Sequence, residues 1–215
     1  MSTDTLRLVF GIGMVTLAAL YSLPQWLRVR RTGSVEGVSL AATSNAFISC
    51  VAWVVYGAVL GDVWVLLTCI AALPSLGATT WILVRNHASR EGMTTTWVWT
   101  GALVVGAAIA PWTSTPIDVV LGASILWYVA PAAWMAWTSA DVTGVSAGAW
   151  YVLLADASLW LLYSLLTGIV TGVLYAVFAG GGALVVLARL AWRWGPDCGV
   201  CAPLGSCTCS SVASS

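Results

Sequence analysis

The chain carries one residue pattern twice, at a spacing of 107 residues. The segment 24–56 aligns without a gap with the segment 131–163. Such a repeat indicates two similar structural units in one chain, so it limits the fold more than any single motif does. The pairs in and just before the two copies are Tyr21 with Tyr128, Pro24 with Pro131, Gly37-Val38-Ser39 with Gly144-Val145-Ser146, Trp53 with Trp160, and Tyr56 with Tyr163.

The composition predicts a membrane protein. The chain is 60% hydrophobic and 7% charged, whereas about 25% of residues in a soluble domain are charged. A soluble chain of 215 residues cannot bury so much apolar surface, so the bilayer is the expected solvent. The net charge is zero, which argues against a nucleic-acid partner. No lysine is present, which excludes a retinal Schiff base.

Seven apolar segments each approach the roughly 20 residues that a helix needs to cross a bilayer. The first is not a cleaved signal, because no small-x-small site follows it and it runs directly into three arginines. We therefore predict an all-α protein with seven transmembrane helices. The predicted spans are 7–29, 39–60, 63–84, 95–112, 117–137, 147–167 and 170–192.

The repeat spacing divides these spans into three, one and three. Three spans are an odd number, so the fourth span restores the orientation and makes the two three-helix bundles parallel repeats. This symmetry is typical of one class of secondary transporter, with the substrate site at the repeat interface. The predicted segments are a first repeat at 1–86, a linker helix with its loops at 87–115, a second repeat at 116–192, and a Cys- and Ser-rich tail at 193–215.

The arginines predict the orientation. Arginines concentrate in cytoplasmic loops, and only Arg7 would lie outside if the N-terminus is outside and the C-terminus is cytoplasmic. The reverse topology would leave a single arginine inside. The arginines placed in the cytoplasm are Arg28, Arg30, Arg31, Arg85, Arg90, Arg189 and Arg193. We expect the plasma membrane as the location.

Two prolines lie at matching places of the first and fifth spans, Pro24, which precedes Gln25, and Pro131. A proline inside a helix removes one hydrogen bond and kinks the axis. The pair predicts hinges on which each three-helix unit rocks; the alternative is a static kink that shapes packing.

Trp53 and Trp160 each lie inside a span and are repeat images of one another. Two facing indoles would clamp a sugar ring, while the alternative is core packing. Other tryptophans near span ends fit an interfacial belt. These are Trp97, Trp99, Trp112, Trp192 and Trp194.

Polar residues inside apolar spans are functional hypotheses by default. Asn45 and Ser49 precede Trp53 at intervals of four, so the three share one helix face. Asp156 takes the place of Ser49 in the second copy and is the one carboxylate well inside a span. It is a candidate for proton coupling or for substrate binding, or a structural acid bonded to Ser158 or to a neighbouring helix. Acids at span ends need no special role; these are Asp62, Asp118 and Asp141.

The third and seventh spans add Thr68 with Cys69 and, at the corresponding depth, Tyr175 with Ala176. Thr68 and Tyr175 are candidate hydroxyl donors to a substrate. Cys50 and Cys69 are expected as small apolar fillers. Glycines of the last span are expected to let helices approach closely; they are Gly168, Gly172 and Gly180-Gly181-Gly182.

The tail carries four cysteines in a C-x2-C-x5-C-x-C pattern. Four thiolates are a zinc ligand set, but the rest of the tail is rich in Gly, Ser and Pro, so no metal is expected and the cysteines are weak candidates only. They are Cys198, Cys201, Cys207 and Cys209.

Pro24-Gln25, Gly37-Val38-Ser39, Trp53-x-x-Tyr56-Gly57 and Asp62 together look like a PQ-loop repeat, and the chain over 7–192 resembles the SWEET sugar transporters. The half-sized bacterial relatives, the SemiSWEETs, dimerise a single such bundle. The resemblance implies facilitated, bidirectional transport of a mono- or disaccharide by alternating access. It also implies that Trp53 and Trp160 line the pocket.

The chain departs from the family pattern at two pocket positions. The resemblance places asparagines where this sequence has Cys69 and Ala176, and the second copy has Ala132 in place of the glutamine. The prolines that plant members carry in helices 2 and 6 are also missing. Asn45 and Asp156 are the polar groups available as substitutes.

Three functions stay open from the sequence. The first is a sugar uniporter, and the second is a proton-coupled transporter of an amino acid or other small metabolite that uses Asp156. The third is a non-transporting cargo receptor or scaffold on the same fold. An enzyme is not expected, since no nucleophile–base pair lies in the spans, and no cofactor is expected. The expected partners are a sugar and the bilayer, with a homo-oligomer as an open alternative.

Overall fold

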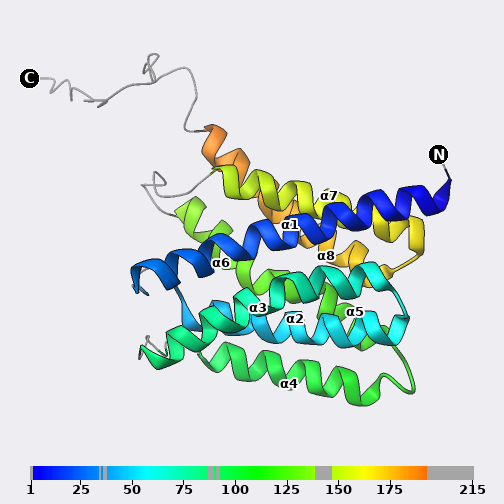
Figure 1. The fold of residues 1–215 in the computed structure, drawn as a ribbon, viewed down its shortest axis with the longest axis horizontal. Helices are drawn as coiled ribbons and strands as arrows, with labels where there is room; N and C mark the ends of the chain where they lie inside the picture. Colours follow the sequence, from blue (N-terminus) through cyan, green and yellow to red (C-terminus); the bar gives the residue numbers. More distant parts are fainter. Residues whose placement is uncertain are drawn as a thin grey trace, which may run out of the picture.

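Every regular element in the described part of the chain is a helix. A computed structural model describes residues 2–33, 35, 38–86, 90, 93–138 and 147–192. The long helices run side by side (Figure 1). In chain order they are α1 (Thr3–Thr32), α2 (Leu40–Leu60), α3 (Val63–Arg85), α4 (Met93–Ile109), α5 (Thr115–Gly122), the 3-10 turn η1 (Ala123–Ile125), α6 (Leu126–Thr138), α7 (Ala147–Thr167) and α8 (Val170–Trp192).

The helix boundaries follow from local capping chemistry. Ser39, the last residue of the Gly-Val-Ser motif, is the N-cap of α2, where its hydroxyl accepts the Ala42 amide. Gly61 ends α2 with φ +67°, a conformation that glycine adopts without steric cost. Asp62 follows at once and caps α3 by accepting the amides of Trp64 and Val65. The two-residue turn Gly61-Asp62 between α2 and α3 is therefore a C-cap joined to an N-cap.

Five of the described helices are long and apolar enough to cross a membrane, namely α1, α2, α3, α7 and α8. The fifth predicted span is not one straight helix. Its two parts, Thr115–Ile125 and Val129–Thr138, meet at a bend of 40°, and they make a sixth crossing if they are taken together. The helix α4 has 17 residues, about 25 Å at 1.5 Å per residue, which is short of a roughly 30 Å hydrocarbon core. The seven-span count and the domain boundaries stay predictions.

The helices pack in the same order in both halves. The third helix of the first half, α3, packs against α1 and α2, and the last helix, α8, packs against α7 and against α5 and α6. Between the halves, α1 packs on α7, and α2 packs on α5, η1 and α6. The connecting helix α4 packs against α2 and α5. One hydrophobic core cluster lies where the two halves meet, and a second lies within the second half, among α6, α7 and α8.

The tryptophan assignment needs one correction. Trp97, Trp112 and Trp192 are 73%, 82% and 79% exposed, as expected for interfacial or lipid-facing residues. Trp99, however, is 4% exposed, because α4 turns it onto α2, where its indole N–H donates to Ser49 Oγ at 2.8 Å. The belt prediction was wrong for Trp99, and Trp194 lies outside the described residues.

Two of the predicted glycine contacts are present. A Cβ at Gly172 would overlap Ser164 and Trp160 of α7, and a Cβ at Gly182 would overlap Val129 of α6. At Gly181 a Cβ would meet open space. Gly168 serves a different purpose, since its φ of +76° turns the chain between α7 and α8.

Candidate functional site

A cavity of about 180 Å³ lies between the two halves, and it is lined from α1, α2, α3, η1, α6, α7 and α8. All eight residues predicted to bind substrate line it. The sequence therefore locates the cavity wall, while the substrate-binding role of these residues stays a prediction. They are Asn45, Ser49, Trp53, Thr68, Cys69, Asp156, Trp160 and Tyr175.

One face of α2 forms part of the cavity wall. Asn45, Ser49 and Trp53 recur every four residues and line the same cavity, as the spacing predicted. Ser49 accepts the indole N–H of Trp99. Asn45 is 5% exposed; its amide nitrogen donates to Thr95 Oγ1 at 3.5 Å, and its Oδ1 is buried without a hydrogen-bond partner.

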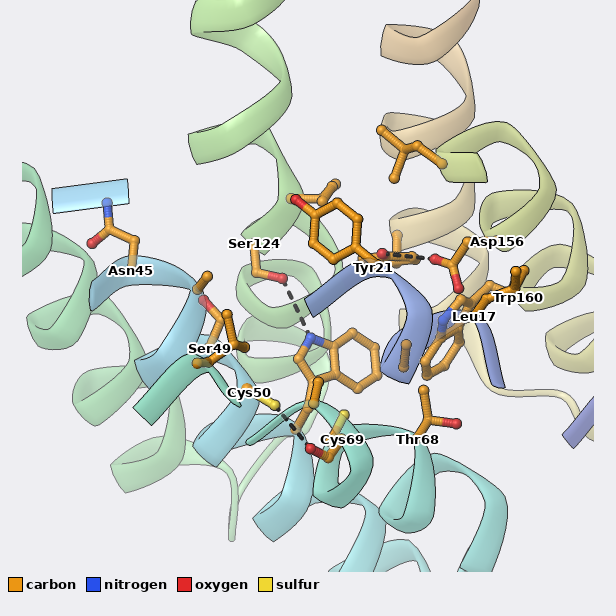
Figure 2. A pocket seen from close by; sticks show the side chains of 18 of the residues that line it. Leu17, Tyr21, Asn45, Ser49, Cys50, Thr68, Cys69, Ser124, Asp156 and Trp160 are labelled. Carbon is orange, nitrogen blue, oxygen red and sulfur yellow. Dashed lines mark hydrogen bonds between the residues drawn. The ribbon is translucent and has the colours of Figure 1, made fainter. Parts of the chain in front are cut away.

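The two repeat-related tryptophans meet at the centre. Trp53 and Trp160 are 5% and 4% exposed, with ring centroids 5.1 Å apart and planes inclined at 55°. The Trp53 indole N–H donates to Ser124 Oγ at 3.3 Å (Figure 2). The indoles touch each other, so no ring fits between them as in the predicted clamp. A solute would instead stack on the side that faces the cavity.

Asp156 is the one charged side chain among the described residues that line the cavity. Its Oδ2 accepts the Tyr175 hydroxyl at 3.0 Å (Figure 2). The bond to Ser158 is absent, because the Ser158 hydroxyl donates to the Leu154 carbonyl of its own helix. Asp156 therefore faces the cavity. The bond to Tyr175 does join Asp156 to the neighbouring helix α8, so the structural alternative stays open beside the functional ones.

The remaining predicted residues, Thr68 and Cys69, are bonded within the first half. The Thr68 hydroxyl donates to the Trp64 carbonyl at 2.8 Å. The Cys50 thiol donates to the Cys69 carbonyl at 3.1 Å (Figure 2), and both cysteines are buried and free. These cysteines thus also tie α2 to α3, beyond filling space.

The prolines lie away from the cavity. Pro24 and Gln25 are exposed on α1, which continues through them to Thr32. Pro131 is exposed on α6 and follows the 40° bend by about one turn. A proline opposes the carbonyl four residues before it, here that of Trp127 within the bend, so Pro131 accounts for the broken helix. The hinge role stays a prediction.

Outside the cavity lining, the two halves are joined by bonds that the sequence did not indicate. Tyr163, which is fully buried, donates to the carboxylate of Asp62 at 2.7 Å, and Arg7 pairs with the same carboxylate at 3.5 Å. Its repeat image, Tyr56, donates to Asp118 at 2.7 Å.

Thr171 also donates to Asp118 at 2.7 Å, and its Oγ1 lies 2.6 Å from the Tyr56 hydroxyl. Both tyrosines reach from one half to a carboxylate of the other, so Asp62 and Asp118 have partners that their place at helix ends did not reveal. The available signal was the repetition of Tyr56 and Tyr163 themselves.

Metal ligation finds no support among the described residues, which contain no group of three or more His, Cys, Asp or Glu able to hold an ion. His87 and the second Gly-Val-Ser motif lie outside the described residues, as do the candidate tail ligands Cys198, Cys201, Cys207 and Cys209.

Comparison with known proteins gives one match. The model of the PQ loop repeat family matches residues 6–66, which cover α1, α2 and the start of α3. No curated protein matches the chain. The chain is thus a multi-pass membrane protein whose regular elements are all helices over the described residues, and its first part matches a PQ loop repeat.

Proposed function

We propose that this chain is a membrane transporter that carries a small solute by alternating access through the cavity between its halves. The observation that carries the proposal is the cavity itself, lined by repeat-related residues of both halves. We expect the bonds Tyr163–Asp62 and Tyr56–Asp118, which join the halves, to close one end of it. Transporters built from parallel repeats bind substrate at such an interface. Breaking these bonds would open that end.

The three-one-three arrangement is part of this proposal. It is supported by the equivalent packing of α3 and α8 within their halves and by the two interfaces α1–α7 and α2–α5/α6. The PQ loop repeat match to the first half and the sequence repeat in the second support two units of one type.

Two solute classes are each favoured by one observation. A sugar, which the resemblance to SWEET transporters implies, is favoured by the aromatic surface of Trp53 and Trp160 in the cavity wall. An amine-bearing metabolite is favoured by the carboxylate of Asp156. A cargo receptor or scaffold does not need the solute-sized cavity.

The test is uptake of radiolabelled solutes into proteoliposomes, with and without an imposed pH gradient. We expect wild-type flux of a sugar or an amine and loss of that flux in Trp53→Ala. Proton coupling requires a response to the gradient that Asp156→Asn removes. The absence of flux for sugars, amines and amino acids alike would contradict a transporter and favour the scaffold.

A further inference from the structure

Among the described polar groups that line the cavity, some hydrogen-bond acceptors have no donor. Several donors are already used: Tyr175 donates to Asp156, Thr68 to the Trp64 carbonyl, and Cys50 to the Cys69 carbonyl. Two acceptors are not used. The Oδ1 atom of Asn45 is buried without a partner, and the bond from Tyr175 occupies only Oδ2 of Asp156. The unused acceptors therefore favour a ligand that donates hydrogen bonds or carries positive charge.

The described part of the cavity wall carries a carboxylic acid without a positively charged partner. Asp156 is the one carboxylic acid there, and no arginine, lysine or histidine is among the described residues that line the cavity. The chain has no lysine at all. Arg7 pairs with Asp62 at the start of α1, and Arg30, Arg85 and Arg189 each stack on a tryptophan near the end of a helix. A carboxylate in a membrane interior is costly without a positive partner, and a cationic solute supplies one.

The aromatic part of the wall suits a cation. Tyr175 lies 5.3 Å from Trp160 and 6.1 Å from Trp53 between ring centroids, so with the 5.1 Å indole pair it forms a contiguous aromatic cluster. Trp127 and Tyr21 also line the cavity. Aromatic faces attract ammonium groups, and aromatic cages are the usual site of quaternary ammonium ligands. Because Tyr175 bonds to Asp156, the carboxylate lies at the edge of this cluster.

We infer that the cavity binds a small organic monocation, a primary to quaternary ammonium compound, with Asp156 as its counter-ion and Trp53, Trp160 and Tyr175 as its aromatic cage. This inference rests on the proposed transport function and names its solute class. A neutral sugar carries no charge and would leave the Asp156 carboxylate without a counter-ion. A zwitterionic amino acid needs a cation for its carboxylate, and the described wall offers none. The cavity volume of about 180 Å³ suits a small compound, since drug-sized ligands take roughly 300–1,000 Å³.

The first experiment measures binding to the purified full chain in lipid nanodiscs by calorimetry. The probes are tetramethylammonium, choline and the neutral isostere of choline in which carbon replaces the quaternary nitrogen. Shape is held constant between choline and its isostere, so the difference reports charge. We expect choline to bind at least about tenfold more tightly, a difference of about 1.4 kcal/mol, because only choline is attracted to the carboxylate and to the aromatic faces.

The second experiment repeats the titration with variants of Asp156. Asp156→Asn keeps the shape and removes the charge, so the preference for choline over its isostere should disappear. Asp156→Glu keeps the charge and should retain a preference for the cation. Asp4→Asn removes an exposed carboxylate at the start of α1, outside the cavity, and should leave binding unchanged. Circular dichroism and gel filtration establish that each variant is folded.

The outcomes separate this inference from the proposed function. Equal binding of choline and its isostere, no binding of either ammonium probe, or an unchanged preference in folded Asp156→Asn overturns the cation site. Glucose flux in proteoliposomes without choline binding also overturns the cation site, but it supports the proposed transport function. Charge-selective choline binding without flux of choline or any other solute supports the cation site and removes the transporter.

Discussion

At the residue scale, the two tyrosines that follow the tryptophans hold the halves together. Each is a single hydroxyl bonded to a carboxylate at 2.7 Å across the interface. A hydrogen bond to a charged group contributes about 1.5–3 kcal/mol, so a pair of them is large beside the energy that separates two conformations of a transporter. They are expected to set the balance between closed and open forms.

Removal of both hydroxyls, in Tyr56→Phe with Tyr163→Phe, should open that end of the cavity, because the rings still pack while the bonds to Asp118 and Asp62 are lost. Cys50 and Cys69 line the cavity and are natural reporters. In a background with the tail cysteines replaced by serine, a membrane-impermeant thiol reagent should label them several-fold faster than in the parent.

The matched control for this labelling is Tyr151→Phe, which alters an exposed tyrosine of the same helix as Tyr163. Its labelling rate should equal that of the parent. An unchanged rate in the double variant would show that the two tyrosines do not close the cavity.

Trp99→Phe should destabilise the protein by about 1–3 kcal/mol, because it leaves Ser49 without the donor to its buried oxygen. Thermal unfolding in detergent measures the loss. Trp97→Phe changes a largely exposed tryptophan of the same helix and should have little effect, so equal losses in the two variants would contradict the role assigned to the Trp99–Ser49 bond.

At the element scale, the helix contacts depend on where glycine removes a side chain. Gly182 lets α8 approach Val129 of α6, while Gly181, one residue earlier, faces open space. Gly182→Ala should therefore lower the unfolding temperature through overpacking, which typically costs about 1–3 kcal/mol. Gly181→Ala should be neutral or slightly stabilising, since alanine is the better helix former. Equal behaviour of the two variants in a thermal scan would contradict the α6–α8 packing.

The hinge role of the paired prolines Pro24 and Pro131 can be tested by comparing flux with solute binding. If Pro24 and Pro131 are hinges, Pro24→Ala and Pro131→Ala should slow flux in proteoliposomes more than they weaken solute binding, because the cavity contains neither residue. Pro74→Ala changes the unpaired proline of α3 and should leave the ratio of flux to binding unchanged. A parallel loss of both quantities in the paired variants would favour static kinks.

The sequence predicted the elements well where local chemistry decides them. The ends of α2, α3, α7 and α8 lie within one residue of the predicted limits, because caps such as Ser39 and Asp62 are visible in the sequence. A kink in the fifth span was predicted from Pro131, and a 40° bend lies about one turn before that residue. The division of this span into the separate helices α5 and α6 was not predicted. The cavity residues were found from the repeat and the spacing of four along α2. The partners of Asp62, Asp118 and Trp99 were not found from the sequence, because these partners lie on other helices.

At the scale of the whole molecule, α1, α3 and α8 all end on the side opposite the N-terminus (Figure 1). Arg30, Arg85 and Arg189, each stacked on a tryptophan, lie near these ends. Charge and aromatic rings thus gather at one end of the bundle, as at a membrane–water interface.

The predicted topology places this end in the cytoplasm. A membrane-impermeant biotin reagent should then reach the tail cysteines in sealed cells only after permeabilisation, while an epitope added before Met1 should be detected on intact cells. Detection of the N-terminal epitope only in permeabilised cells would reverse the orientation.

The carboxylate at the cavity exists in one copy, although the wall that carries it exists in two. Asp156 corresponds to Ser49 of the first copy, and both line the cavity. If two identical units met across a two-fold axis, any acid on the cavity wall would occur twice. Two neighbouring carboxylates oppose each other's ionisation. Joining the units through α4 lets the copies differ, so the cavity can hold an odd number of charges. A lone negative charge at the centre is thus a property that a fused pair of unequal halves can have and a symmetric dimer of either half cannot.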